Sequence, residues 1–240
     1  MNNIENKKVL ITGGSEGLDK ALAKKMHDMG ASVTILSRSE AKLKLVASEI
    51  GCKYIICDIT NLEDCKKVKQ EIGDIDILIN NAGVWTDDNL EKTNPEKIAS
   101  TLQVNIIGAI QMTSMFLPRM KELNHGTIFF TNSISGRFPI ADPEARTYSA
   151  SKWGLRGYAE ALKEDLKNTK IKVIQIHPCG FDTNIFESSG WDKNISHNQP
   201  WMTSTENIAN AAMFSLNQPD DINISSIVID KSPSNPDMNQ

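Results

Sequence analysis

The sequence predicts a single-domain α/β fold: a doubly wound, seven-stranded parallel sheet with helices on both faces. Short apolar runs alternate with helical stretches along the chain, the pattern of parallel strands joined by crossover helices. The runs are rich in Val, Ile and Leu, as expected for strands that are buried on both faces. The chain has 240 residues, of which 40% are hydrophobic, and this is enough to bury a substantial core. No repeat or linker divides it, so we expect one domain over residues 1–240.

Seven apolar runs predict the strands, at residues 8–12, 32–36, 53–57, 75–79, 127–130, 172–176 and 226–229. Between them, apolar residues at helical spacing predict amphipathic helices. The stripes are Leu18, Leu22, Met26 and Met29; Leu43, Val46 and Ile50; and Ala159, Leu162 and Leu166. The crossovers between parallel strands should be right-handed. The tail, residues 231–240, is predicted to be frayed.

Charge and composition exclude several classes of function. The formal net charge of -4 argues against a protein that binds bulk nucleic acid or an anionic membrane, because such proteins carry an excess of Lys and Arg. No apolar stretch approaches the ~18 residues of a membrane helix, and the first residues lack the apolar core of a signal peptide. The cysteines form no Cys-x-x-Cys pair and no His stands at ligand spacing. We therefore expect reduced thiols, no metal site and a cytoplasmic location.

A glycine-rich turn follows the first predicted strand directly. The strand ends at Thr12, the turn is Gly13-Gly-Ser-Glu-Gly17, and a helical stripe begins at Leu18. Glycine admits positive φ and lets the backbone approach a diphosphate, while the following helix N-terminus offers free N–H groups and a partial positive charge. In this strand–turn–helix context, the pattern predicts a dinucleotide-binding Rossmann fold.

The end of the second predicted strand bears on the choice of dinucleotide. An acidic residue at this place holds a ribose 2′-hydroxyl, whereas a nearby Arg accommodates a 2′-phosphate. Here the acidic residue is missing, Ser37 stands near its place and Arg38 follows, which favours NADP(H). Glu16 in the glycine turn opposes this because its charge would repel the extra phosphate, so NAD(H) stays possible. The alternative for Arg38 is a solvated charge at a helix start.

Tyr148 and Lys152 stand four residues apart where a long helix is predicted to begin. This spacing places them on one helical face. A free phenol has a pKa of about 10, and a nearby ammonium group lowers that pKa by stabilising the phenolate. Such a tyrosine can give a proton to a carbonyl oxygen or take one from an alcohol. Taken alone, the pair is a common accident on a helix surface.

Further motifs make the chain resemble the short-chain dehydrogenase/reductase family over nearly its whole length. The first turn is similar to that family's Thr-Gly-x-x-x-Gly-x-Gly motif. Asn80-Asn-Ala-Gly83 follows the fourth strand as in the family, and Asp58-Ile-Thr60 resembles its adenine-contacting segment. Residues 178–183 resemble the Pro-Gly-x-x-x-Thr segment that closes over the nicotinamide. Each motif is weak alone, but together they occur in the expected order and on the expected elements.

The resemblance implies a catalytic tetrad made of Asn105, Ser133, Tyr148 and Lys152. Ser133 would polarise the substrate carbonyl and Tyr148 would be the general acid or base. Lys152 would lower the pKa of Tyr148 and hold the nicotinamide ribose. Asn105 would lie in a helix distortion and hold a water that relays protons. The structural alternatives are a helix kink at Asn105 and a strand-end cap at Ser133. The implied cofactor-binding residues are Thr12, Gly13, Ser15, Glu16, Gly17, Leu18, Ser37, Arg38, Asp58, Ile59, Asn81, Ala82, Gly83, Tyr148, Lys152, Pro178, Gly180 and Thr183.

The function that the resemblance implies is oxidoreduction with NAD(P)(H), NADP(H) being favoured. The substrate would be a small carbonyl compound (a ketone, an aldehyde or a 3-oxo compound) or the matching alcohol, and the reaction would be hydride transfer. The alternative is a non-catalytic regulatory protein that binds the nicotinamide nucleotide with impaired affinity. Relatives associate through helices corresponding to residues 101–123 and 145–168, so a homodimer or homotetramer is expected.

Two residues depart from the family pattern. Asp19 replaces the last glycine of the first turn, adding bulk and negative charge where a diphosphate would lie, so we expect weaker cofactor affinity than in an Asp19→Gly variant. Cys179 replaces the glycine after Pro178. A substrate lid is expected over residues 181–204, a segment that holds several large apolar residues: Phe181, Phe186, Trp191, Trp201 and Met202. Their alternative role is to attach this loop to the core or to a partner subunit.

Overall fold

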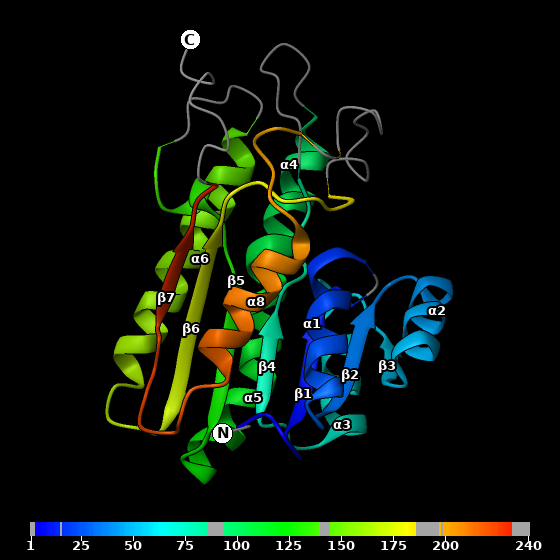
Figure 1. Ribbon diagram of the computed structural model, residues 1–240, viewed down its shortest axis with the longest axis vertical. Coiled ribbons are helices and arrows are strands. Elements are labelled where there is room, and N and C mark those ends of the chain that lie inside the picture. The colour runs from blue at the N-terminus through cyan, green and yellow to red at the C-terminus, as the bar shows by residue number, and fades with distance from the viewer. Residues whose placement is uncertain are drawn as a thin grey trace.

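The computed structural model describes residues 3–14, 16–85, 94–139, 145–185, 197 and 199–231. Ser15, half of the predicted lid, including Phe186 and Trp191, and nearly all of the predicted frayed tail lie outside these ranges. The described chain forms the predicted seven-stranded parallel sheet, in the order β3-β2-β1-β4-β5-β6-β7. Figure 1 shows this sheet as a twisted array with β7 at one edge and β3 near the other. The fold class expected from the alternating pattern is confirmed.

All seven predicted strands are present, with small differences at their ends. The strands are β1 Lys8–Thr12, β2 Ser32–Ser37, β3 Lys53–Ile56, β4 Ile77–Asn80, β5 Gly126–Thr131, β6 Ile171–Pro178 and β7 Ser226–Ile229. The largest differences are at β4 and β6. β4 begins two residues later than expected, and β6 runs on to Pro178, where it pairs with the end of β7.

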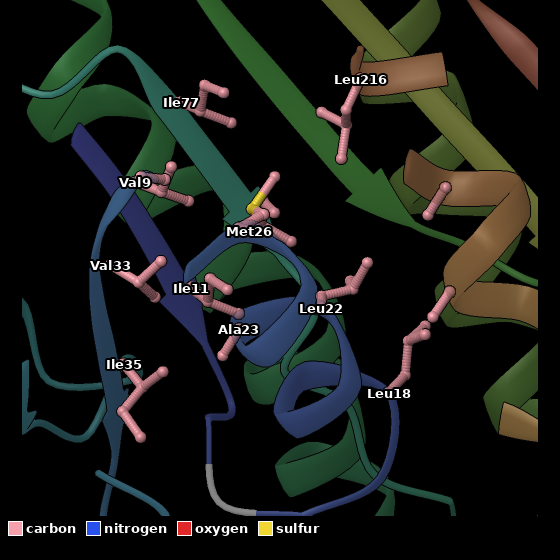
Figure 2. Packing of buried hydrophobic residues seen from close by; sticks show 14 of the residues in the cluster. Val9, Ile11, Leu18, Leu22, Ala23, Met26, Val33, Ile35, Ile77 and Leu216 are labelled. Atoms are coloured by element: carbon pink, nitrogen blue, oxygen red, sulfur yellow. The ribbon is translucent and has the colours of Figure 1, made fainter. Parts of the chain in front are cut away.

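Helices cover both faces of the sheet because successive strand residues point to opposite faces. On one face, α1 Gly17–Asp28, α2 Glu40–Ile50 and α8 Thr205–Leu216 share a core with one set of strand residues. On the other, α3 Leu62–Ile72, α5 Ala109–Leu123 and α6 Arg146–Asp165 pack against the alternate set. Figure 2 shows the first core, where Val9, Ile11, Val33 and Ile35 face the apolar side of α1. The predicted helical stripes are these buried faces, apart from Met29, which is half-buried just after α1.

The helix expected over residues 101–123 is interrupted. α4 Pro95–Leu102 leads into a π-helical segment, Gln103–Gly108, before α5 begins. Hydropathy periodicity does not reveal such a widened turn, because the apolar face continues through it. Among the described helices, none combines the length and apolar character that crossing a bilayer requires.

Candidate active site

The glycine turn after β1 has the backbone that only glycine accepts easily. Gly13 and Gly17 have φ of +91° and +66°, in the left-handed region. The N–H groups of Gly13 and Gly14 donate to the Leu36 carbonyl, at 2.8 and 3.0 Å, which ties the turn to the end of β2. A Cβ on Gly13 would lie 3.0 Å from the Cα of Ala82, and one on Gly14 would overlap the Ile35 side chain. The turn therefore packs closely against β2 and the segment after β4.

A cleft of about 690 Å³ lies at the carboxyl ends of the central strands. In open parallel sheets this edge is where ligands bind. Most of the residues that the sequence assigns to the cofactor or to catalysis line it: Gly13, Glu16, Leu18, Ser37, Arg38, Asp58, Ile59, Asn81, Ala82, Gly83, Ser133, Tyr148, Lys152, Pro178, Gly180 and Thr183. Thr12, Gly17 and Asn105 are described but do not line it. The structure thus brings together motifs that are scattered through the chain.

Thr12 and Gly17 do not line the cleft but contact residues that do. The Thr12 hydroxyl accepts hydrogen bonds from the N–H groups of Asn81 and Ala82, each at 3.1 Å, and so joins the end of β1 to the segment after β4. A Cβ on Gly17 would lie 2.9 Å from the Thr183 hydroxyl, so the glycine turn meets the segment after β6 closely. Both residues support the cleft's shape.

An ion pair and a hydrogen bond on Glu16 link three elements across one end of the cleft. Its carboxylate pairs with Lys42 of α2 and accepts a hydrogen bond from Asn184, in the segment after β6. Partial burial opposes ionisation of Glu16, but the bonds from Lys42 and Asn184 outweigh it and lower its pKa. The exposed Arg38 lines the same end. Two cations and one paired carboxylate therefore surround the end of β2.

Tyr148 and Lys152 lie on the inner face of α6, one turn apart, and both are buried. The Lys152 Nζ donates to the Thr131 carbonyl at 2.9 Å and lies 5.6 Å from the centroid of the Tyr148 ring. Burial raises the pKa of Tyr148 to about 12, although a hydrogen bond with Ser133 acts to lower it. Burial also lowers the pKa of Lys152 to about 8. The direction for Tyr148 is opposite to the sequence expectation, because loss of hydration disfavours the phenolate.

Ser133 is held at the end of β5 by a chain of buried amides. Its N–H donates to the Asn132 Oδ1 at 3.0 Å, and the Asn132 amide donates to the Gln175 Oε1 at 3.2 Å. The Gln175 amide in turn donates to Glu160 of α6 at 3.1 Å. A Cβ on Gly136 would lie 2.6 Å from the Asn132 Oδ1, so a glycine is needed beside this chain. The serine's backbone position therefore depends on three elements.

Asn105 lies in the π-helical segment, and its side chain points into the protein's polar interior. Its Oδ1 accepts from the Val84 N–H at 2.8 Å, and its amide donates to the Val84 carbonyl and to the Ser151 hydroxyl, at 3.0 and 2.9 Å. Both amide N–H bonds are therefore used. This side chain fixes the segment after β4 against α6.

Both residues that depart from the family pattern, Asp19 and Cys179, are buried. Asp19 is buried in the first turn of α1, and its Oδ2 would lie 3.3 Å from a Cβ on Gly13. Cys179 is buried, with its N–H donating to the Ile229 carbonyl at 2.7 Å. Of the predicted lid residues that are described, Trp201 packs against Gly180, where a Cβ would overlap the indole, whereas Met202 is buried. Phe181 packs partly against the first core.

Among the cleft residues that the sequence did not single out are Lys42, Trp85 and Asn184. Lys42 stands four residues after Arg38, a helical spacing that offered a signal. Trp85 comes two residues after the Asn-Asn-Ala-Gly motif, and its ring centroid lies 4.6 Å from that of Tyr148, tilted by 38°. Nothing in the local sequence connects Trp85 or Asn184 with the cleft, because tertiary packing brings them there.

A Rossmann sheet with a glycine turn at one end of its cleft and a Ser, Tyr and Lys at the other defines the class, a Rossmann-fold oxidoreductase. Comparison with known proteins gives the family. The model of the short chain dehydrogenase family matches residues 7–194, and the chain belongs to that family. As a member, it is an oxidoreductase that acts on CH–OH groups.

Relatives match over most of the chain. An uncharacterized oxidoreductase of Staphylococcus epidermidis is 28% identical over 235 residues, which is 95% of this chain and 99% of that protein. A 3-dehydrosphinganine reductase of Arabidopsis thaliana is 34% identical over 191 residues, 77% of this chain and 59% of that protein. The closed form of a serine dehydrogenase complexed with NADP+ is 25% identical with a TM-score of 0.85, over 92% and 94% of the chains. A metagenomic short-chain oxidoreductase in complex with NADP is 26% identical with a TM-score of 0.79, over 95% and 98%.

Proposed function

We propose that the protein is an NADPH-preferring reductase of small carbonyl compounds, with Tyr148 as the proton donor. The observation that carries the proposal is the buried group of Ser133, Tyr148 and Lys152 at one end of a cleft that begins at a glycine turn. The hydrogen bond between Tyr148 and Ser133 puts two hydroxyl groups side by side, as needed to hold one carbonyl oxygen.

The residues of the cleft fit a dinucleotide. Positive φ at Gly13 and Gly17 lets the backbone come close to a diphosphate, which the first turn of α1 would hold. Arg38 and Lys42 supply the cations that a 2′-phosphate requires, and the two solved neighbours named above, each in complex with NADP, support this choice. When bound, the nicotinamide supplies or accepts the hydride. NAD(H) is the alternative, supported by the carboxylate of Glu16 beside these cations.

The chain's own residues would manage the proton. Tyr148, with its pKa near 12, keeps its proton at neutral pH and can donate it to a carbonyl oxygen that has become an alkoxide. Ser133 would donate a hydrogen bond to the same oxygen. Lys152, within 5.6 Å of the Tyr148 ring centroid, would stabilise the phenolate that the donation leaves. In the reverse direction the same hydroxyl group, once deprotonated, would take the proton back from the alcohol.

A second candidate is a regulatory protein that binds the nucleotide without turnover. The buried carboxylate of Asp19 beneath the glycine turn favours it, because that charge would weaken diphosphate binding. The test is NADPH oxidation with a panel of ketones and aldehydes, for the wild type and Tyr148→Phe. We expect turnover by the wild type and a loss of about 100-fold or more in kcat with NADPH binding retained in the variant. NADPH binding with no turnover of any carbonyl would favour the regulatory protein.

A homodimer or homotetramer is proposed through α5, α6 and the preceding π-helical segment. Ile107 and Trp153 on these elements are 42% and 44% exposed, so two neighbouring helical elements each present a large apolar side chain to a second copy. Sedimentation would test this, and a monomer at micromolar concentration would contradict it.

A further inference from the structure

The charged side chains of the cleft gather at its nucleotide end. They come from the glycine turn, α1, and the ends of β2 and β3: Glu16, Asp19, Arg38, Lys42 and Asp58. Among the described lining residues on the segments that follow β4, β5 and β6 and on α6, Lys152 is the one charged residue, and its Nζ donates to the Thr131 carbonyl. The proposed reaction uses this one described cation of the catalytic end beside Tyr148, and no second described cation lines that end to hold a substrate carboxylate.

Aromatic and aliphatic side chains make up much of the catalytic end. The described ones are Val84, Trp85, Ile134, Phe181 and Trp201. Trp85 is the nearest of these to the chemistry, because its ring contacts the ring of Tyr148 at a centroid distance of 4.6 Å. Trp201 covers Gly180 and is 46% exposed, so apolar surface stands open at the same end.

We propose that the substrate is a neutral carbonyl compound whose carbonyl group carries an apolar group, best an aromatic one, that packs against Trp85. Burial of apolar surface favours the binding of such a compound. A carboxylate buried here would lose its hydration with no opposite charge to compensate for the loss, which disfavours the binding of an acid. Trp85 is then a specificity-determining residue. The inference rests on the proposed carbonyl reduction and narrows its substrate class, excluding 3-oxo acids and amino acids as the preferred substrates.

Two matched pairs of carbonyl compounds test the inference with the purified protein and NADPH. Ethyl acetoacetate against acetoacetate changes the charge and keeps the reacting ketone, and benzylacetone against acetone adds the aromatic group. We expect kcat/KM to be roughly 100-fold higher for the ester than for the acid, and at least about tenfold higher for benzylacetone than for acetone. An acid that is turned over as well as its ester overturns the inference and leaves carbonyl reduction standing. No turnover of any of the four overturns both.

Variants test the role of Trp85 separately. Trp85→Ala should lower the benzylacetone-to-acetone ratio about tenfold, whereas Trp85→Phe, which keeps an aromatic ring beside Tyr148, should retain most of it. The control is Phe214→Ala, which removes an exposed aromatic on α8 that does not line the cleft. An unchanged ratio in both Trp85 variants, with Phe214→Ala equal to wild type, overturns the assignment of Trp85.

Discussion

Removing the charge of Asp19 should tighten the binding of NADPH. The side chain is only 4% exposed, and its carboxylate lies beneath the glycine turn, with Oδ2 3.3 Å from the place of a Cβ on Gly13. Asp19 also lines the cleft in which a diphosphate would bind, and two unit charges ~7 Å apart repel by ~2 kcal/mol at an effective dielectric constant of ~20. Because ~1.4 kcal/mol corresponds to a factor of ten, Asp19→Asn should bind NADPH ~10- to 30-fold more tightly.

The assay is calorimetric titration with NADPH at two salt concentrations. Asp19→Asn keeps the size of the side chain and Asp19→Gly removes it, so the pair separates charge from bulk. Asp28→Asn is the control, because it makes the same charge change at the exposed far end of α1. The gain should shrink at high salt, and both Asp19 variants should lose ~0.3–1 kcal/mol of stability, since a carboxylate favours a helix start. Equal or weaker NADPH binding by both Asp19 variants would refute the reasoning.

Three further predictions follow from the packing around the cleft. Burial lowers the pKa of His177 to about 4, so the unfolded chain binds the extra proton first as pH falls. The free energy of unfolding, from denaturant titration, should therefore drop by up to about 3 kcal/mol between pH 6.5 and pH 4 and be flatter in His177→Asn. Gly14→Ala should destabilise the fold by ~1–3 kcal/mol by overlapping a core side chain of β2, whereas Gly157→Ala, with open space around it, should be neutral or stabilising in thermal melts. Gln175→Met should break the amide chain to Ser133 and lower kcat with little change in the KM for NADPH; an unchanged kcat would make that chain purely structural.

The order of the elements and the places of the main motifs were predictable from the sequence. Strand runs buried on both faces and helical stripes follow from local periodicity, which is why all seven strands appear where the pattern put them, within a few residues at their ends. The glycine turn was equally readable, because positive φ at Gly13 and Gly17 depends on the residue type itself. The spacing of Tyr148 and Lys152 placed both on one face of α6 for the same local reason.

Long-range packing decided the rest. Glu16 meets Lys42 and Asn184 only because α1, α2 and the segment after β6 converge at one edge of the sheet. The raised pKa of Tyr148 depends on how deeply α6 is buried, and no spacing of residues encodes that depth. The sequence by itself thus determined the fold, through residue type and period, and the family, through motifs that occur in the expected order. The tertiary structure alone decided which side chains share the cleft and how they ionise, since desolvation and contacts between distant segments arise only when the chain is folded.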